Sequence, residues 1–181
     1  YRALDFQNAD LKNQTLKNLL AKGQNEDQVI ILRQAAFDTQ KPDATLLNLA
    51  KAKSGEIADD QDFLDIVRKY QLKDQKDRLL SIVNQENDGR QASAAAGIFT
   101  SLYGLGDVEK AMKDPDQTKA IAAIRKFGVV DNREMALLLS KFWGDANAPS
   151  AIRTAAMEEA RGYQSEATLW EFAEKDQIPA D

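Results

Sequence analysis

Cysteine and histidine are both absent from this chain of 181 residues. Their absence excludes disulfides, thiolate catalysis, Cys/His zinc sites, His-ligated haem, Ser-His-Asp triads and acid–base chemistry by histidine. The longest apolar run lies around residues 94–99 and is far shorter than the ~20 residues of a membrane-spanning helix. We therefore expect no membrane span, and no residue pattern calls for a cofactor.

The overall balance of charge and hydrophobicity is that of an ordinary folded chain. Hydrophobic residues make up 43% of the sequence and charged residues 29%, with a formal net charge of −5. A disordered chain has fewer apolar residues and a larger charge imbalance. Nucleic acids bind clustered Lys and Arg, so the acidic balance argues against a nucleic acid as partner.

Nine glycines and four prolines divide the chain into short segments whose apolar residues recur at helical spacing. No convincing run alternates with the period of two that is typical of strands. The sequence predicts an all-α fold with helices over residues 10–22, 27–37, 42–54, 60–70, 73–85, 90–103, 107–113, 117–127, 132–143, 150–161 and 165–175. Helices of about this length are unstable alone, and their short connections force them into antiparallel hairpins.

One short pattern recurs along the chain. It consists of Asp or Asn, an aliphatic residue and Arg five and six positions later, and Ala three positions after the Arg. Complete copies are Asp27, Leu32, Arg33 and Ala36, and Asn147, Ile152, Arg153 and Ala156; partial copies are Asp62, Val67 and Arg68, and Thr118, Lys119 and Ala122. The steps from Arg33 to Arg68 and from Lys119 to Arg153 fit a repeat of ~30–45 residues.

This pattern resembles the second half of a HEAT repeat. The resemblance implies antiparallel helical hairpins stacked as a HEAT-like α-α superhelix, with residues 1–181 as a single α-solenoid domain. Small Ala residues let paired helices approach closely, and each hairpin needs neighbours to cover its apolar surface. We expect the arginines to form a ladder by reaching Asp, Asn or exposed carbonyls of neighbouring turns, although one of them could instead face a partner. The ladder residues are Arg33, Arg68, Arg153, Asp27 and Asn147.

Aromatic residues gather near the end of the sequence. Phe142, Trp170 and Phe172 are predicted to pack in the core between the last helices. Trp143 stands just before Gly144, so we expect it to be partly exposed at a helix end. Because Trp and Tyr are favoured at interfaces, Trp143 and Tyr163 are the candidate partner contacts.

Two acidic segments are candidate cation sites. Asn84, Glu86, Asp88 and Gly89 match the start of an EF-hand loop, but Ala95 occupies the position of its bidentate Glu. Four aspartates within residues 59–65 surround a predicted helix start, where carboxylates are favoured by the helix dipole. Capping and solvation explain both segments better than a metal does.

The sequence leads to three functional hypotheses. The first is a non-catalytic scaffold that positions neighbouring domains or binds a partner protein. The second is the structural segment of a large secreted bacterial oxidoreductase that combines a sugar-dehydrogenase-like domain with cytochrome c, its catalysis lying outside this chain. This hypothesis rests on a likeness in style to HEAT-type arrays of such proteins, and no Cys-x-x-Cys-His motif is present. The weakest is a small helical enzyme that works through carboxylates.

The two ends of the sequence suggest a piece of a longer protein. The chain begins with Tyr1 rather than Met, and Pro179 near its end is typical of a turn that opens a further element. The compartment stays open, with a periplasmic or secreted location slightly favoured over the cytoplasm.

Overall fold

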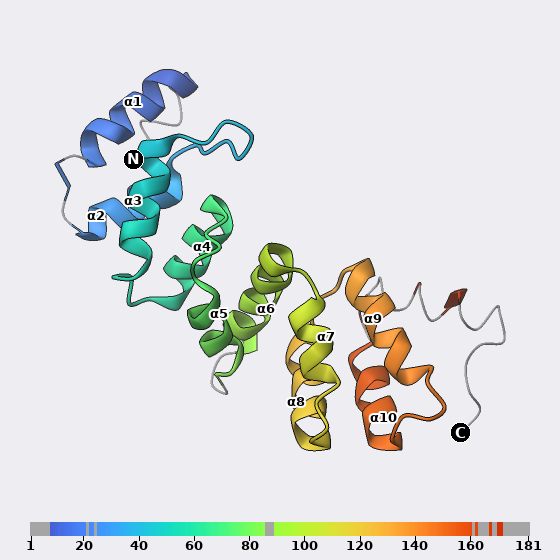
Figure 1. The fold of residues 1–181 in the computed structure, drawn as a ribbon. Coiled ribbons are helices and arrows are strands. Elements are labelled where there is room, and N and C mark those ends of the chain that lie inside the picture. The colour runs from blue at the N-terminus through green and yellow to red at the C-terminus, as the bar shows by residue number, and fades with distance from the viewer. Residues whose placement is uncertain are drawn as a thin grey trace. The chain divides into compact units, whose positions relative to one another are not determined.

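The computed structural model describes residues 8–20, 22–23, 25–85, 89–160, 162, 167 and 170–171. Ten helices make up this described part, and no strand occurs in it (Figure 1). The all-α prediction is therefore confirmed, while most of the predicted helix over 165–175 lies outside the described residues. The helices are α1 (Ala9–Leu20), α2 (Asn25–Gln34), α3 (Ala44–Ser54), α4 (Asp60–Tyr70), α5 (Lys76–Val83), α6 (Gly89–Tyr103), α7 (Gly106–Met112), α8 (Gln117–Gly128), α9 (Arg133–Trp143) and α10 (Ser150–Glu159).

Several helices begin directly after a capping side chain. The carboxylate of Asp59 accepts a hydrogen bond from the backbone N–H of Asp62 at 2.9 Å and starts α4. Asp43 and Asp116 start α3 and α8 in the same way, and the side-chain oxygen of Asn132 starts α9. Each cap satisfies backbone N–H groups that have no partner within the helix.

Residues 1–76 and residues 77–181 form two compact units, here called the N-terminal unit and the C-terminal unit. In the N-terminal unit, α1 packs on α2, α2 packs on both α3 and α4, and α3 packs on α4. In the C-terminal unit, α6 packs on α7 and α8, α7 on α8, and α8, α9 and α10 on one another. Within each unit these packed helices are close neighbours in the sequence.

The even-numbered helices within a unit pack with their C-terminal ends together. In the N-terminal unit, the Tyr70 hydroxyl at the end of α4 donates to the Leu32 carbonyl near the end of α2 at 2.9 Å. In the C-terminal unit, the rings of Phe99 and Phe127 near the ends of α6 and α8 lie 5.6 Å apart. Gly128, the last residue of α8, lies against Glu159, the last residue of α10. Contacts near the same end are typical of parallel neighbours. In addition, Lys126 of α8 donates to Asn84, in the connection before α6, at 2.7 Å.

The core of each unit is built from buried apolar side chains of several helices. Phe63, Leu64, Ile66 and Val67 of α4 are fully buried in the N-terminal unit. The C-terminal unit buries large aromatic side chains, among them Phe99 and Trp143. Burial of side chains of this size stabilises a fold by about 1.5–3 kcal/mol each, so these side chains contribute much of the stability of each unit.

Candidate functional site

Arg33 links two consecutive hairpins of the N-terminal unit. One of its terminal nitrogens forms an ion pair with Asp62, and the other lies 2.8 Å from a carboxylate oxygen of Asp65. Both aspartates belong to the first half of α4, whereas Arg33 belongs to the last turn of α2. The Arg33 side chain is 39% exposed, so solvent screens the pair and its contribution to stability is modest.

The end of α4 satisfies carbonyl groups at the end of α2. The Lys69 ammonium donates to the carbonyls of Leu32 and Arg33, at 2.9 and 2.6 Å. The Tyr70 hydroxyl also donates to the Leu32 carbonyl, and its ring contacts that of Phe37 at 4.5 Å between centroids, with the two planes tilted by 52°. Burial, together with the charge of Lys12, lowers the pKa of Lys69 from 10.5 to about 8. These bonds replace water at carbonyls that have no partner within the helix.

The other predicted ladder residues take different roles. Arg68 and Asp27 are exposed, and neither forms an ion pair with another described residue. Half-buried Arg153 donates from Nε to the carbonyl of Trp143 at 3.4 Å, and so ties α10 to the end of α9. Asn147 is exposed, and its backbone N–H donates to the Asp145 carboxylate at 2.9 Å. Arg33 thus binds Asp62 and Asp65 rather than Asp27, and the contact given for Arg153 is to a carbonyl.

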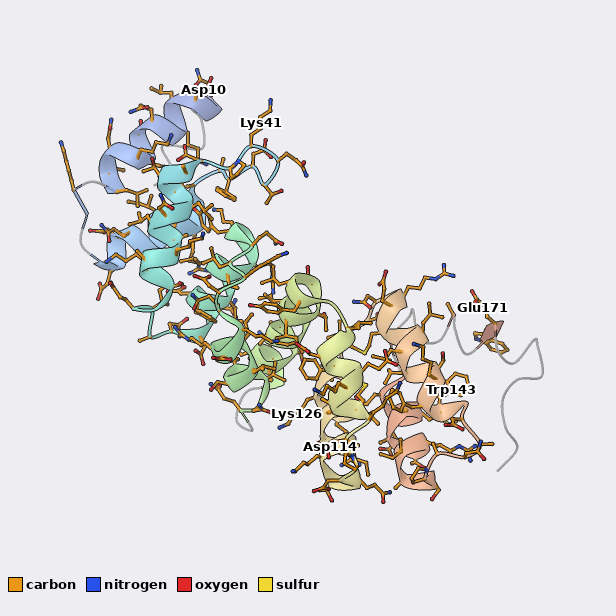
Figure 2. All side chains as sticks on the ribbon, in the orientation of Figure 1. Asp10, Lys41, Asp114, Lys126, Trp143 and Glu171 are labelled. Carbon is orange, nitrogen blue, oxygen red and sulfur yellow. The ribbon has the colours of Figure 1, made fainter. Side chains whose placement is uncertain are left out.

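The aromatic residues near the end of the sequence are arranged differently from the prediction. Trp143 is 1% exposed, so the expectation that it is partly exposed is wrong (Figure 2). The reason is that α9 and α10 pack closely, with Arg153 of α10 binding the carbonyl of this last helical residue. Phe142 is buried as predicted, but Trp170 is 71% exposed and does not pack in the core. Tyr163 and Phe172 lie outside the described residues.

No group of three or more acidic side chains within the described residues is arranged to hold a metal ion. The aspartates around residue 60 have other roles, because Asp59 caps α4 and two others bind Arg33. The Asp59 cap confirms the capping interpretation for that residue. Residues 86–88 of the EF-hand-like segment lie outside the described residues.

A groove of about 460 Å³ opens between the first half of α2 and the connection from α3 to α4. We call it the Ile30 groove. It is lined by Glu26, Val29, Ile30, Lys53, Glu56, Ile57, Ala58, Asp59 and Asp62. Ile30 is 41% exposed and Ile57 is 7% exposed, so an accessible aliphatic side chain lies beside a buried one. Four carboxylates and one ammonium surround this apolar floor, which makes the groove acidic.

A second, wider hollow of about 610 Å³ lies at the opposite ends of α2 and α4. Phe37, Pro42, Leu47 and Tyr70 provide its apolar surface, and Lys51, Lys73 and Asp74 provide charges of both signs. Lys41 belongs to the same loop between α2 and α3 as Pro42 (Figure 2). The mixed charge gives this hollow no clear preference for one class of ligand.

Polar clusters in the C-terminal unit are exposed ion pairs. Lys113 lies 2.7 Å and Lys141 lies 3.7 Å from the same carboxylate oxygen of Glu109. The hydrogen bond and charge of Lys113, followed by the charge of Lys141, lower the pKa of Glu109. Arg125 of α8 approaches Glu158 of α10 at 3.6 Å, also on the surface. Glu109 and Lys113 line a hollow of about 720 Å³ beside α7, where the carboxylate is already bound by two ammonium groups.

Neither the Ile30 groove nor the aromatic contacts at the ends of helices are predicted by the sequence patterns. In the sequence, Ile30 is one of several apolar residues on a broad helical face. No feature of the neighbouring sequence shows that α3 and α4 leave its side chain accessible. The sequence does contain a pattern that could have indicated the aromatic contacts. Phe37, Tyr70 and Tyr103 follow one another at a constant spacing of 33 residues, which is close to a HEAT-type period.

Comparison of the chain with models of protein families, with curated proteins and with solved structures found no match. Within the described residues, no helix combines the length and the apolar character needed to cross a bilayer.

Proposed function

We propose that this chain is a HEAT-like α-solenoid segment that acts as a non-catalytic scaffold and binds protein. The proposal is supported above all by the parallel packing of even-numbered helices in sequence order. A stack of helical hairpins produces this parallel packing, because equivalent helices of successive repeats lie side by side. The pairs are α2 with α4, α6 with α8, and α8 with α10.

The contacts between these helices support the same interpretation. Arg33 joins α2 to α4, and Arg125 joins α8 to α10, so polar side chains connect successive hairpins in both units. Gly128 allows α8 and α10 to approach closely, as the small residues of stacked helices do. A scaffold needs such contacts and a surface for a partner, and it needs no reactive group.

Hydrogen exchange on the whole chain tests the solenoid. A linear array unfolds in parts, because each repeat depends on its immediate neighbours. The substitution Gly128→Ala, which disturbs α8 and α10, should therefore lower protection in α8, α9 and α10 and leave α2 to α4 protected. Equal loss of protection in every helix would instead indicate one closed cooperative core, and the solenoid proposal would fail.

Selection from a random peptide library displayed on phage tests the binding role. The immobilised protein should enrich peptides with a shared motif, and a synthetic copy of that motif should bind the protein in solution. No enrichment above the blank support would contradict a protein-binding role. The charge of the enriched peptides is left open by this test.

A further inference from the structure

The Ile30 groove has the two features of a peptide-binding surface. Its floor contains an accessible aliphatic side chain, Ile30, beside buried Ile57. Peptides and helices bind such grooves by inserting apolar side chains, while polar groups at the rim fix their orientation. Among the acidic residues of the groove, Asp59 has a structural role because it caps α4. No such structural role explains the accessible apolar floor.

The charge of the groove indicates what kind of segment fits. Lys53 already forms an ion pair with Glu56 at 2.7 Å, and Arg33 binds Asp62 from outside the groove. Even with both cations counted, carboxylates outnumber them, and exposed Glu26 stands in the first turn of α2. The N-terminal unit as a whole has as many acidic as basic residues. The acidity of the groove is therefore a local excess and not a property of the whole unit.

We infer that the Ile30 groove binds a basic segment of a partner protein, which places an aliphatic side chain against Ile30 and its Lys or Arg side chains along the acidic wall. This inference rests on the proposed protein-binding function and names the chemistry of the partner. Complementary charge speeds the encounter and sets specificity, and burial of the aliphatic side chain provides most of the affinity.

Three labelled peptides of twelve residues serve as probes, and their binding is measured by fluorescence anisotropy. The first has a central Leu-Ile pair flanked by Lys and Arg, the second has Ser in place of that pair, and the third has Glu in place of every basic residue. We expect the first peptide to bind most tightly and to shift the methyl signals of Val29, Ile30 and Ile57 in NMR spectra. Binding should weaken as salt is raised.

Matched substitutions separate the groove from general attraction to an acidic protein. The C-terminal unit holds the chain's net charge of −5, so a basic peptide could also collect there. Leu137 of α9 is 41% exposed, as Ile30 is, and Glu134 occupies the first turn of α9, as Glu26 does in α2. These two residues therefore provide controls of the same exposure and position.

Ile30→Ser should weaken binding of the first peptide about tenfold, because loss of two to three buried carbons costs about 1.4 kcal/mol or more. Glu26→Gln should weaken it about threefold, a typical loss for one partly exposed ion pair. Leu137→Ser and Glu134→Gln should leave binding unchanged, and all four variants should keep the helical circular dichroism of the parent.

Several results would overturn the inference: equal losses at Ile30 and Leu137, equal binding of the acidic peptide, or methyl shifts away from the groove. If the library selection then still enriched another class of peptide, the protein-binding proposal would stand and the inference alone would fail. If the selection enriched nothing, the proposed function itself would fail.

Discussion

The contact between Gly128 and Glu159 gives the sharpest test of how the helices pack. A Cβ atom added at Gly128 would lie 2.6 Å from the Cβ and 2.9 Å from the Cγ of Glu159. Cβ is held by the backbone, so α8 and α10 must move apart to accept Gly128→Ala. Overpacking of this kind costs about 1–3 kcal/mol, and alanine returns about 0.4–1 kcal/mol by restricting the unfolded chain. We expect a net loss of about 1–2 kcal/mol in the free energy of unfolding.

Gly97 provides the control for this substitution. It lies within α6, and a Cβ added there would meet no atom within 4 Å. Gly97→Ala should therefore raise the free energy of unfolding by about 0.4–1 kcal/mol, because it gains helix propensity without a clash. Urea unfolding followed by circular dichroism measures both variants. If Gly128→Ala proves as stable as Gly97→Ala, the close approach of α8 and α10 does not exist in solution.

Three further predictions concern the polar contacts. Arg33→Ala should lower the free energy of unfolding by about 0.5–1 kcal/mol in low salt and by less in high salt. The control Arg68→Ala should change it by less than about 0.5 kcal/mol. Equal effects of the two substitutions would show that the ion pairs of Arg33 do not stabilise the fold. Arg153→Ala should cost about 1 kcal/mol, because the Trp143 carbonyl loses a donor, and an unchanged urea midpoint would show that this bond contributes nothing. The pKa of Lys69 is lowered to about 8 by burial and by a nearby charge, so between that pH and 10 the unfolded chain holds more protons than the folded one, and stability should rise with pH. Lys69→Met should flatten this rise in urea titrations at pH 7 to 10, and parallel pH profiles would contradict the lowered pKa.

The helices could be predicted from the sequence because their signals are local. Apolar spacing and residues such as Asp59 and Asn132 place helix starts within one or two residues of those observed for α4 and α9. The predicted helix over 73–85 begins three residues late, at Lys76. Gln71 takes a left-handed conformation with a φ of 53°, and a separate turn occupies Lys73 and Asp74.

The surface could not be predicted in the same way, since exposure depends on which helices meet. Trp143 stands before a glycine, which suggests an exposed helix end, yet α10 packs against α9 and the side chain is buried. Trp170 carries an equally apolar side chain and is exposed. Likewise, the aspartates bound by Arg33 lie 29 and 32 positions further along the chain, at a distance that the short sequence pattern does not encode.

The joining of parallel helices at their C-terminal ends has a mechanical consequence. In the N-terminal unit, Tyr70 and Lys69 fasten α4 to α2 at the end opposite the Ile30 groove. These bonds, here called the clamp, set the spacing of α2 and α4 at this end, so a change of that spacing is carried along the two packed helices towards the groove. A variant such as Tyr70→Phe, made far from the groove, is therefore expected to alter how wide the groove opens, and directed evolution of peptide affinity should find substitutions at this clamp as well as in the groove.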